Sequence, residues 1–178
     1  MKLALILIEE EKIVGNILIV SATNDKNLVL AKDFQSILLD LSFSAEVISL
    51  EDLSFPLFSS EAIVDEKHLQ TLLSKIKDSD GFIFCAPEYN GGVPPVLSNA
   101  ITWITVKSQN WREVFNRKFA LIGTSSGGDG HRFINAFRSQ LEYLGTNVLA
   151  RTVSVNKNKP LDNESVVRIL QELINIIK

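Results

Sequence analysis

Residues 81–86 read GFIFCA, an apolar run that no charged residue interrupts. A strand with one solvated face alternates apolar and polar residues, so this pattern is typical of a strand buried on both faces, as in a parallel sheet. Residues 16–21 (NILIVS), 45–50 (AEVISL) and 118–123 (KFALIG) are further runs rich in apolar and β-branched residues. Together with residues 147–155, they predict five strands.

Helical spacing of apolar residues marks the segments between these runs. Leu28, Ala31, Phe34, Leu38 and Leu41 lie three or four residues apart and form one stripe. Polar residues and prolines mark residues 51–60 and 87–95 as loops. The predicted helices cover residues 27–42, 66–77 (capped by Asp65), 95–104, 131–144 and 161–178 (capped by Asp162).

The alternation of strands with helices predicts an α/β domain. Right-handed crossovers between parallel strands place helices on both faces of the sheet. Five strands in a chain of 178 residues favour one doubly wound three-layer sandwich, with strand order 2-1-3-4-5. We assign residues 16–178 to this domain. Residues 1–15 form either an extra edge strand or a disordered extension, and the sequence does not decide between them.

Charge and hydropathy narrow the function classes. The net charge is −3 and no basic stripe is present, which argues against nucleic acid and anionic membranes as partners. No run reaches the roughly 20 apolar residues of a membrane span. The apolar N-terminus is short and three glutamates follow it, unlike a secretory signal. We therefore expect a cytoplasmic protein.

The residues that usually ligate metals or attack substrates are sparse. The single cysteine, Cys85, excludes an intramolecular disulfide and a thiol-rich metal site. His68 and His131 lack ligand-like spacing, so we expect no metal. Cys85 ends an apolar strand, and we interpret it as a core residue rather than a nucleophile. Trp103 and Trp111 are interpreted as core or subunit-interface residues.

Three polar loops follow the predicted strands one, three and four. In a doubly wound sheet, ligands bind beyond the carboxyl ends of the strands near the point where strand order reverses. For this order, the loops there are residues 21–27, 87–95 and 124–130. Two common nucleotide motifs are not matched: residues 123–128 have P-loop glycine spacing, but Asp129 stands where lysine is required, and no G-x-G-x-x-G occurs.

The loop after the third strand carries the most specific motif. It reads PEYNGGVPP over residues 87–95 and leads into Leu97, Asn99, Ala100, Ile101 and Trp103. This resembles the P-E-Y-N-x-x-x-P-x-x-L-x-N-A-I-D-W signature of the NADPH-dependent FMN reductase family, which has a flavodoxin-like fold. The segment from Ser125 to Gly145, with its Ser/Gly-rich start, and the Asp52-Leu53 and Pro56-Leu57 pairs are similar to that family as well. The resemblance covers about residues 16–155.

The resemblance implies an FMN-dependent NAD(P)H oxidoreductase. NADPH or NADH would reduce the flavin, which would pass electrons to a quinone, a free flavin or another small acceptor. The flavin would carry the chemistry, so no catalytic side chain is expected. A homodimer or homotetramer is implied too. The implied cofactor-binding residues are Ser21, Thr23, Asn24, Lys26, Asn27, Pro87, Glu88, Tyr89, Asn90, Gly91, Ser125, Ser126, Gly127 and Gly128.

The loop after the first strand departs from the family pattern. The family reads roughly G-S-x-R-x-x-S-x-N there, whereas this chain has no counterpart of the arginine and Asp25 replaces a serine. We expect Asp25 to cap the first helix in competition with the FMN phosphate, so that Asp25→Ser binds FMN more tightly. The alternative is a flavodoxin-like binding or regulatory module with a weakened or lost flavin site. A flavodoxin-type electron carrier is disfavoured by the modest charge.

Overall fold

The computed structural model describes residues 15–178, so the predicted N-terminal extension lies outside the described residues apart from Gly15. The elements are β1 (Asn16–Ser21), α1 (Lys26–Asp40), β2 (Ser44–Ser49), α2 (Leu50–Leu53), α3 (Glu66–Asp78), β3 (Gly81–Cys85), α4 (Pro95–Lys107), α5 (Trp111–Phe115), β4 (Phe119–Ser125), α6 (His131–Tyr143), β5 (Asn147–Val148), β6 (Val153–Val155) and α7 (Asn163–Ile177).

A parallel sheet forms the middle layer. Its strand order is β2-β1-β3-β4-β5, and β6 also pairs with β4. The register sets Ser21 opposite both Ser49 and Cys85, so β1, β2 and β3 end together. The predicted flavodoxin-like three-layer sandwich with order 2-1-3-4-5 is confirmed.

The fifth strand differs from the sequence prediction, which made residues 147–155 continuous. Val148 pairs with Ala120, and Val153 pairs with Gly123. The outer segment therefore advances by five residues over a stretch in which β4 advances by three. The guanidinium of Arg138 donates to the carbonyls of Val148 and Leu149, at 3.2 and 2.7 Å. These carbonyls are thereby satisfied outside the sheet, and the strand divides into β5 and β6.

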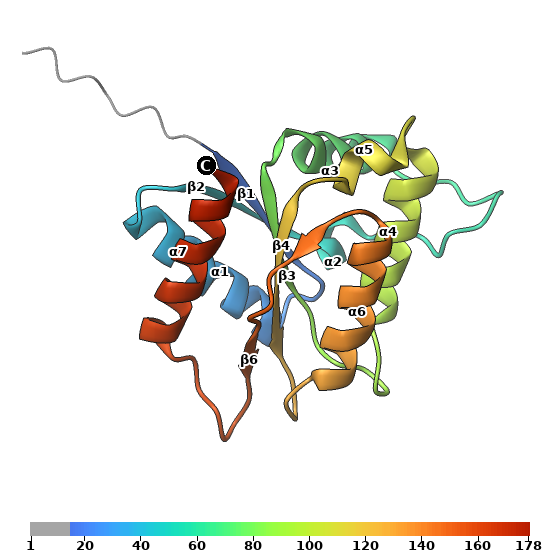
Figure 1. Cartoon of the computed structure of the whole chain (residues 1–178). Helices are drawn as coiled ribbons and strands as arrows, with labels where there is room; N and C mark the ends of the chain where they lie inside the picture. The colour runs from blue at the N-terminus through green and yellow to red at the C-terminus, as the bar shows by residue number, and fades with distance from the viewer. Residues whose placement is uncertain (1–14) are drawn as a thin grey trace, which may run out of the picture.

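Helices cover both faces of the sheet (Figure 1). Helices α1 and α7 lie on one side, and α3, α4, α5 and α6 lie on the other. Successive side chains of β3 point to opposite faces, because a strand has a period of two. Phe82 and Phe84 join one core, and Ile83 and Cys85 join the other. This double burial explains why residues 81–86 show no polar alternation.

Most helix boundaries follow the sequence signals. Asp65 accepts hydrogen bonds from two N–H groups of the first turn of α3, and Asp162 accepts one from Ser165, so both predicted caps are confirmed. Helix α4 continues to Lys107, beyond the predicted end at residue 104. The short helices α2 and α5 were not predicted. Within residues 15–178, no helix is both long and apolar enough to cross a bilayer.

Candidate functional site

The predicted ligand loops meet at the carboxyl edge of the sheet. The loops after β3 and β4 lie at the bottom of Figure 1, below the ends of their strands. The loop after β1 emerges at the same edge, because the ends of β1 and β3 are in register. The three loops thus flank the point where the chain order reverses between β1 and β3, the usual ligand position in this topology.

The PEYNGG segment forms a tight turn. Tyr89 and Gly92 exchange backbone hydrogen bonds of 3.3 and 3.0 Å around Asn90 and Gly91. Both central residues have positive φ, at 51° and 70°, as a type I′ turn requires. Asn and Gly are the residues that adopt this conformation at least cost. The turn leaves the Tyr89 side chain half exposed.

Glu88 joins this turn to helix α6. Its Oε2 accepts hydrogen bonds from the N–H groups of Arg132 and Phe133, at 3.0 and 3.1 Å. The residue that precedes α6 is Gly130, which has no side chain to cap the helix. Glu88 therefore supplies a cap from a distant loop. Its own N–H donates to Ser126 Oγ at 2.8 Å, which ties the loops after β3 and β4 together.

Three glycines at this edge lack any structural need for glycine. A Cβ built on Gly92, Gly127 or Gly128 would meet no atom within 4 Å, and none of the three has a positive φ. Gly130 differs, because a Cβ there would lie 2.7 Å from Thr124 Cγ2. The loop after β4 lines a hollow of about 580 Å³ together with Glu88 and the start of α6. The chain thus presents bare backbone to open space.

Buried polar side chains hold the loops in place. The amide of Asn27 donates to the Ser125 carbonyl at 3.0 Å and accepts from the Ser125 N–H at 2.8 Å. This pair fixes the start of α1 to the end of β4. Ser21 Oγ donates to the Thr23 carbonyl at 2.7 Å, inside the loop after β1. The Ser21 and Asn27 side chains are therefore engaged within the protein.

Asn24 is surrounded by acidic neighbours from α2. Its backbone N–H donates to Glu51 Oε2 at 2.6 Å, and its side-chain amide donates to Asp52 Oδ1 at 2.6 Å. Ser49 Oγ donates to the amide oxygen of Asn24. The backbone N–H, the side-chain NH₂ group and the amide oxygen of Asn24 are thus all hydrogen-bonded within the chain. Lys26, next to this network, is exposed.

The prediction that the Asp25 side chain caps the first helix was wrong. Asp25 does occupy the N-cap position of α1, but its side chain makes no cap hydrogen bond. The carboxylate that accepts a loop N–H is that of Glu51, which the sequence prediction missed. A signal was available: Glu51 and Asp52 directly follow β2, and the register with β1 brings the two strand ends side by side. Their negative charges therefore lie beside the loop after β1.

The motif residues Asn99 and Trp103 have a structural role. Asn99 Nδ2 and Trp103 Nε1 both donate to the carbonyl of Pro56, at 2.9 and 2.8 Å. Asn99 Oδ1 accepts from the N–H of Phe58 at 2.8 Å. They anchor the loop that follows α2 onto α4. Trp103 is fully buried, in line with its interpretation as a core residue; the Trp111 side chain lies outside the described part.

Asp129 is held in place by residues of β6 and the chain that follows it. Ser154 Oγ donates to the Asp129 carbonyl at 2.8 Å and Asn156 donates to its carboxylate at 3.1 Å, so β6 supports the loop after β4. Exposed His131 lies 3.7 Å from the Asp129 carboxylate.

Burial raises the pKa of the Cys85 thiol, which disfavours the nucleophilic thiolate. Among residues 15–178, no group of acidic, His and Cys side chains has metal-binding geometry.

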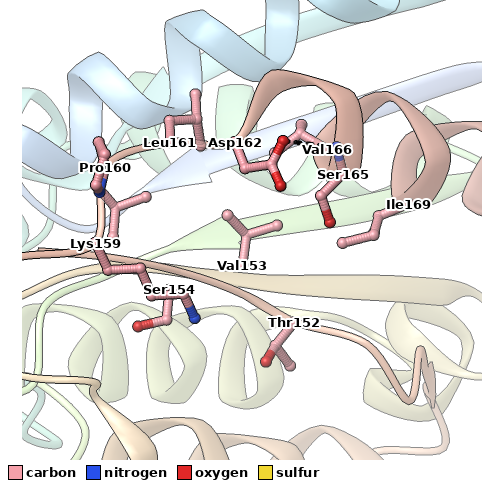
Figure 2. A pocket seen from close by; sticks show the side chains of 11 residues that line it. Thr152, Val153, Ser154, Lys159, Pro160, Leu161, Asp162, Ser165, Val166 and Ile169 are labelled. Carbon is pink, nitrogen blue, oxygen red and sulfur yellow. Dashed lines mark hydrogen bonds between the residues drawn. The ribbon is translucent and has the colours of Figure 1, made fainter.

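A second, smaller hollow lies between β6 and α7 (Figure 2). Val153 and Ile169 point into it from the strand and the helix, and the Asp162 cap of α7 closes one side. Its volume is about 110 Å³. Sites for organic ligands usually occupy ~300 Å³ or more, so we do not assign a flavin or a nicotinamide to it.

Comparison with known proteins defines the class. The family model of NADPH-dependent FMN reductases matches residues 16–159, which include all three loops. The chain therefore belongs to the NADPH-dependent FMN reductase family.

Individual relatives agree with this assignment. The chain is 37% identical over 87 residues to NADH-dependent flavin reductase subunit 2 of Lactobacillus johnsonii, covering 48% of this chain and 47% of the relative. It is 35% identical over 91 residues to a 2-hydroxy-1,4-benzoquinone reductase of a Burkholderia species, covering 49% and 47%. The matched segments thus span about half the length of these relatives.

A solved structure shares the fold along nearly the whole chain. The flavoenzyme NAD(P)H:acceptor oxidoreductase of Paracoccus denitrificans superposes with a TM-score of 0.73 at 17% identity, covering 92% of this chain and 97% of that one. At this identity, the likeness supports the fold.

Proposed function

We propose that this chain is an FMN-dependent NAD(P)H oxidoreductase that passes electrons to a quinone, a free flavin or another small acceptor. The observation that carries the proposal is the bare backbone of Gly92, Gly127 and Gly128 at the sheet edge. Because neither packing nor φ requires glycine there, a ligand that lies against the backbone accounts for all three. A flat isoalloxazine ring with acceptor atoms on its edge is such a ligand.

The predicted residues would act in three ways: by contact with the ring and ribityl chain, by contact with the phosphate, and by support of the loops. Pro87–Gly91 and Ser126–Gly128 would meet the flavin ring and its ribityl chain. The backbone donors there would be the N–H groups of residues 90, 91, 127 and 128, because those of Glu88, Tyr89 and Ser126 are already bonded within the chain. A flavin phosphate would lie at the N-terminus of α1, beside Thr23 and Lys26. Unpaired N–H groups and the helix dipole favour an anion there, and the nearby carboxylates that follow β2 oppose it. Asn27, Ser125 and the Glu88 carboxylate would position these loops from behind.

When bound, the flavin supplies the hydride-accepting and electron-donating chemistry. The chain's own residues bind and orient it. The hydrogen bonds of Glu88 to α6 and of Asn27 to Ser125 set the spacing between the loops. Loops fixed in this way hold their unbonded backbone N–H groups in place, so these donors need no rearrangement when charge develops on a ligand. We assign no acid or base to the site.

We infer a homodimer or homotetramer, supported by Leu57 and Ile63, which expose 82% and 93% of their surface in the loop after α2. Contiguous exposed apolar surface often marks a protein–protein contact. Light scattering at micromolar concentration checks this: a monomer mass contradicts it. A cytoplasmic location stays a prediction from the sequence.

A flavin titration followed by reduction tests the proposed activity. Purified protein is titrated with FMN, and the quenching of flavin fluorescence gives the affinity. NADH and then NADPH are added without oxygen, and a quinone is added last. The proposal expects binding, loss of flavin absorbance with at least one nicotinamide, and its return with the quinone. Protein that leaves FMN fluorescence unchanged at all concentrations contradicts the proposal.

The second candidate is a binding or regulatory module with a weakened flavin site. The acidic neighbours of Asn24 favour it, because the Glu51 and Asp52 carboxylates stand close to the loop that would hold a dianionic phosphate. The same titration separates the two candidates. The module predicts affinity weaker than micromolar and no reduction by either nicotinamide.

A further inference from the structure

We propose that Glu51 makes this site indifferent to the flavin phosphate, so that riboflavin and FMN bind with similar affinity. This inference rests on the proposed function, because it assumes that flavin binds at the carboxyl edge of the sheet. It deepens that function by naming the flavin class: the chain recognises ring and ribityl chain, and gains little from the 5′-phosphate.

The first step is the hydrogen bond itself. An N–H group in the loop between a first strand and a first helix is a typical donor to phosphate. In this chain the Asn24 N–H donates at 2.6 Å to the Glu51 carboxylate. A carboxylate of the chain thus occupies a donor that an incoming phosphate would use. The phosphate must either displace Glu51 or bind without this donor.

The second step is charge. Glu51, Asp52 and Asp25 are exposed acidic residues at the end of β2 and the start of α1, and Lys26 is the basic residue among them. The Asn24 amide, which otherwise offers a neutral donor, is bound to Asp52. Like charges in close proximity repel even at the surface, and the repulsion grows with the charge of the ligand. Riboflavin, which lacks the phosphate, avoids this repulsion.

Glu51 lies away from the loop after β4. The bare glycines Gly127 and Gly128 follow β4, whereas Glu51 follows β2, and β1 and β3 lie between these two strands. A change of charge at Glu51 therefore acts on the phosphate end and leaves the ring end unchanged.

The test compares two flavins and three proteins. FMN and riboflavin are titrated into the wild type, Glu51→Gln and Asp40→Asn, with fluorescence quenching as the readout. Glutamine retains an oxygen that accepts the Asn24 N–H, so it removes the charge and keeps the contact. Asp40 ends α1, which makes Asp40→Asn the matched loss of one negative charge at the far end of the same helix. Thermal melts followed by circular dichroism establish that each variant is folded.

The wild type should bind the two flavins within about threefold of each other. Glu51→Gln should tighten FMN binding on the order of fivefold, leave riboflavin unchanged, and lose the effect at high salt. Asp40→Asn should match the wild type. Wild type that binds FMN tenfold or more tightly than riboflavin, or Glu51→Gln that shifts both flavins equally, overturns the inference while the proposed function stands. Failure of every protein to bind either flavin overturns the proposed function as well.

Discussion

The two sides of the candidate site are built on different principles. On the β3 and β4 side, Glu88 directs its carboxylate to the N–H groups of α6, and the glycines of the loop after β4 face open space. On the β1 and β2 side, carboxylates of α2 accept hydrogen bonds from Asn24. Both sides contain acidic residues. On the first side the acid caps a helix, and on the second side it occupies a loop donor.

This difference teaches which part of the site is set by shape and which by charge. A flat, uncharged ring requires close approach of backbone, which glycine and a type I′ turn provide. A phosphate requires donors and a favourable field, and the acidic residues that follow β2 weaken both.

Filling the space beside the bare backbone has the largest expected effect. Gly127→Leu should weaken FMN binding at least about tenfold, since an overpacked contact costs ~1–3 kcal/mol. It should leave thermal unfolding unchanged, because no atom lies within 4 Å of the added Cβ. Gly130→Ala is the opposite control and should destabilise the fold. If Gly127→Leu binds FMN normally, the ring does not lie against this loop.

Removing the remote cap comes next. Glu88→Ala leaves the N–H groups of Arg132 and Phe133 without their acceptor, and should lower the free energy of unfolding by about 2 kcal/mol. Glu88→Gln keeps an acceptor and should lose less. Denaturant unfolding measures both. Glu164→Ala, an exposed acid on α7, is the control and should change little. Equal stability of Glu88→Ala and Glu164→Ala would show that the cap contributes nothing.

On the other side, Asp25→Ser should strengthen FMN binding by two- to fivefold, corresponding to the ~0.3–1 kcal/mol of an exposed charge at a helix end. The gain should stay below that of Glu51→Gln, because the Asp25 side chain makes no hydrogen bond to the loop. Stability should hardly change. FMN titrations at low and moderate salt measure the effect, and weaker FMN binding in the variant would mean that Asp25 faces away from the phosphate.

The smallest effect is expected at Cys85. Its thiol is fully buried in the core shared by β3 and α1, and hydride transfer to a flavin requires no thiol. Cys85→Ala should keep FMN binding and NAD(P)H oxidation, with a loss of stability of about 1 kcal/mol from the missing sulfur. A folded variant that loses most of its activity would place the chemistry elsewhere.

The fold was predictable because its signals are local. Residues 81–86 are apolar throughout since both faces of β3 are buried, and Asp65 and Asp162 cap the helices that directly follow them. The division of the fifth strand was not predictable, because Arg138 binds the carbonyls of residues 148 and 149 from another element.

The candidate site shows the same limit. Gly127, Gly128 and the Asn90-Gly91 turn were predicted from composition and motif, since the feature that singles each one out belongs to its own backbone. The capping role of Glu88 and the contact of Glu51 with Asn24 join residues 44 and 27 positions apart. Such pairs arise from the packing of elements that are distant in the sequence, which a local motif does not encode.

The central claim is that flavin binds at the carboxyl edge of the sheet. An FMN titration of the wild type and of Gly127→Leu tests it most directly, once the two proteins are shown to have equal melting temperatures. The account predicts saturable quenching of FMN fluorescence by the wild type and at least about tenfold weaker binding by the variant. Identical titration curves for the two proteins, or no quenching by the wild type, would contradict it.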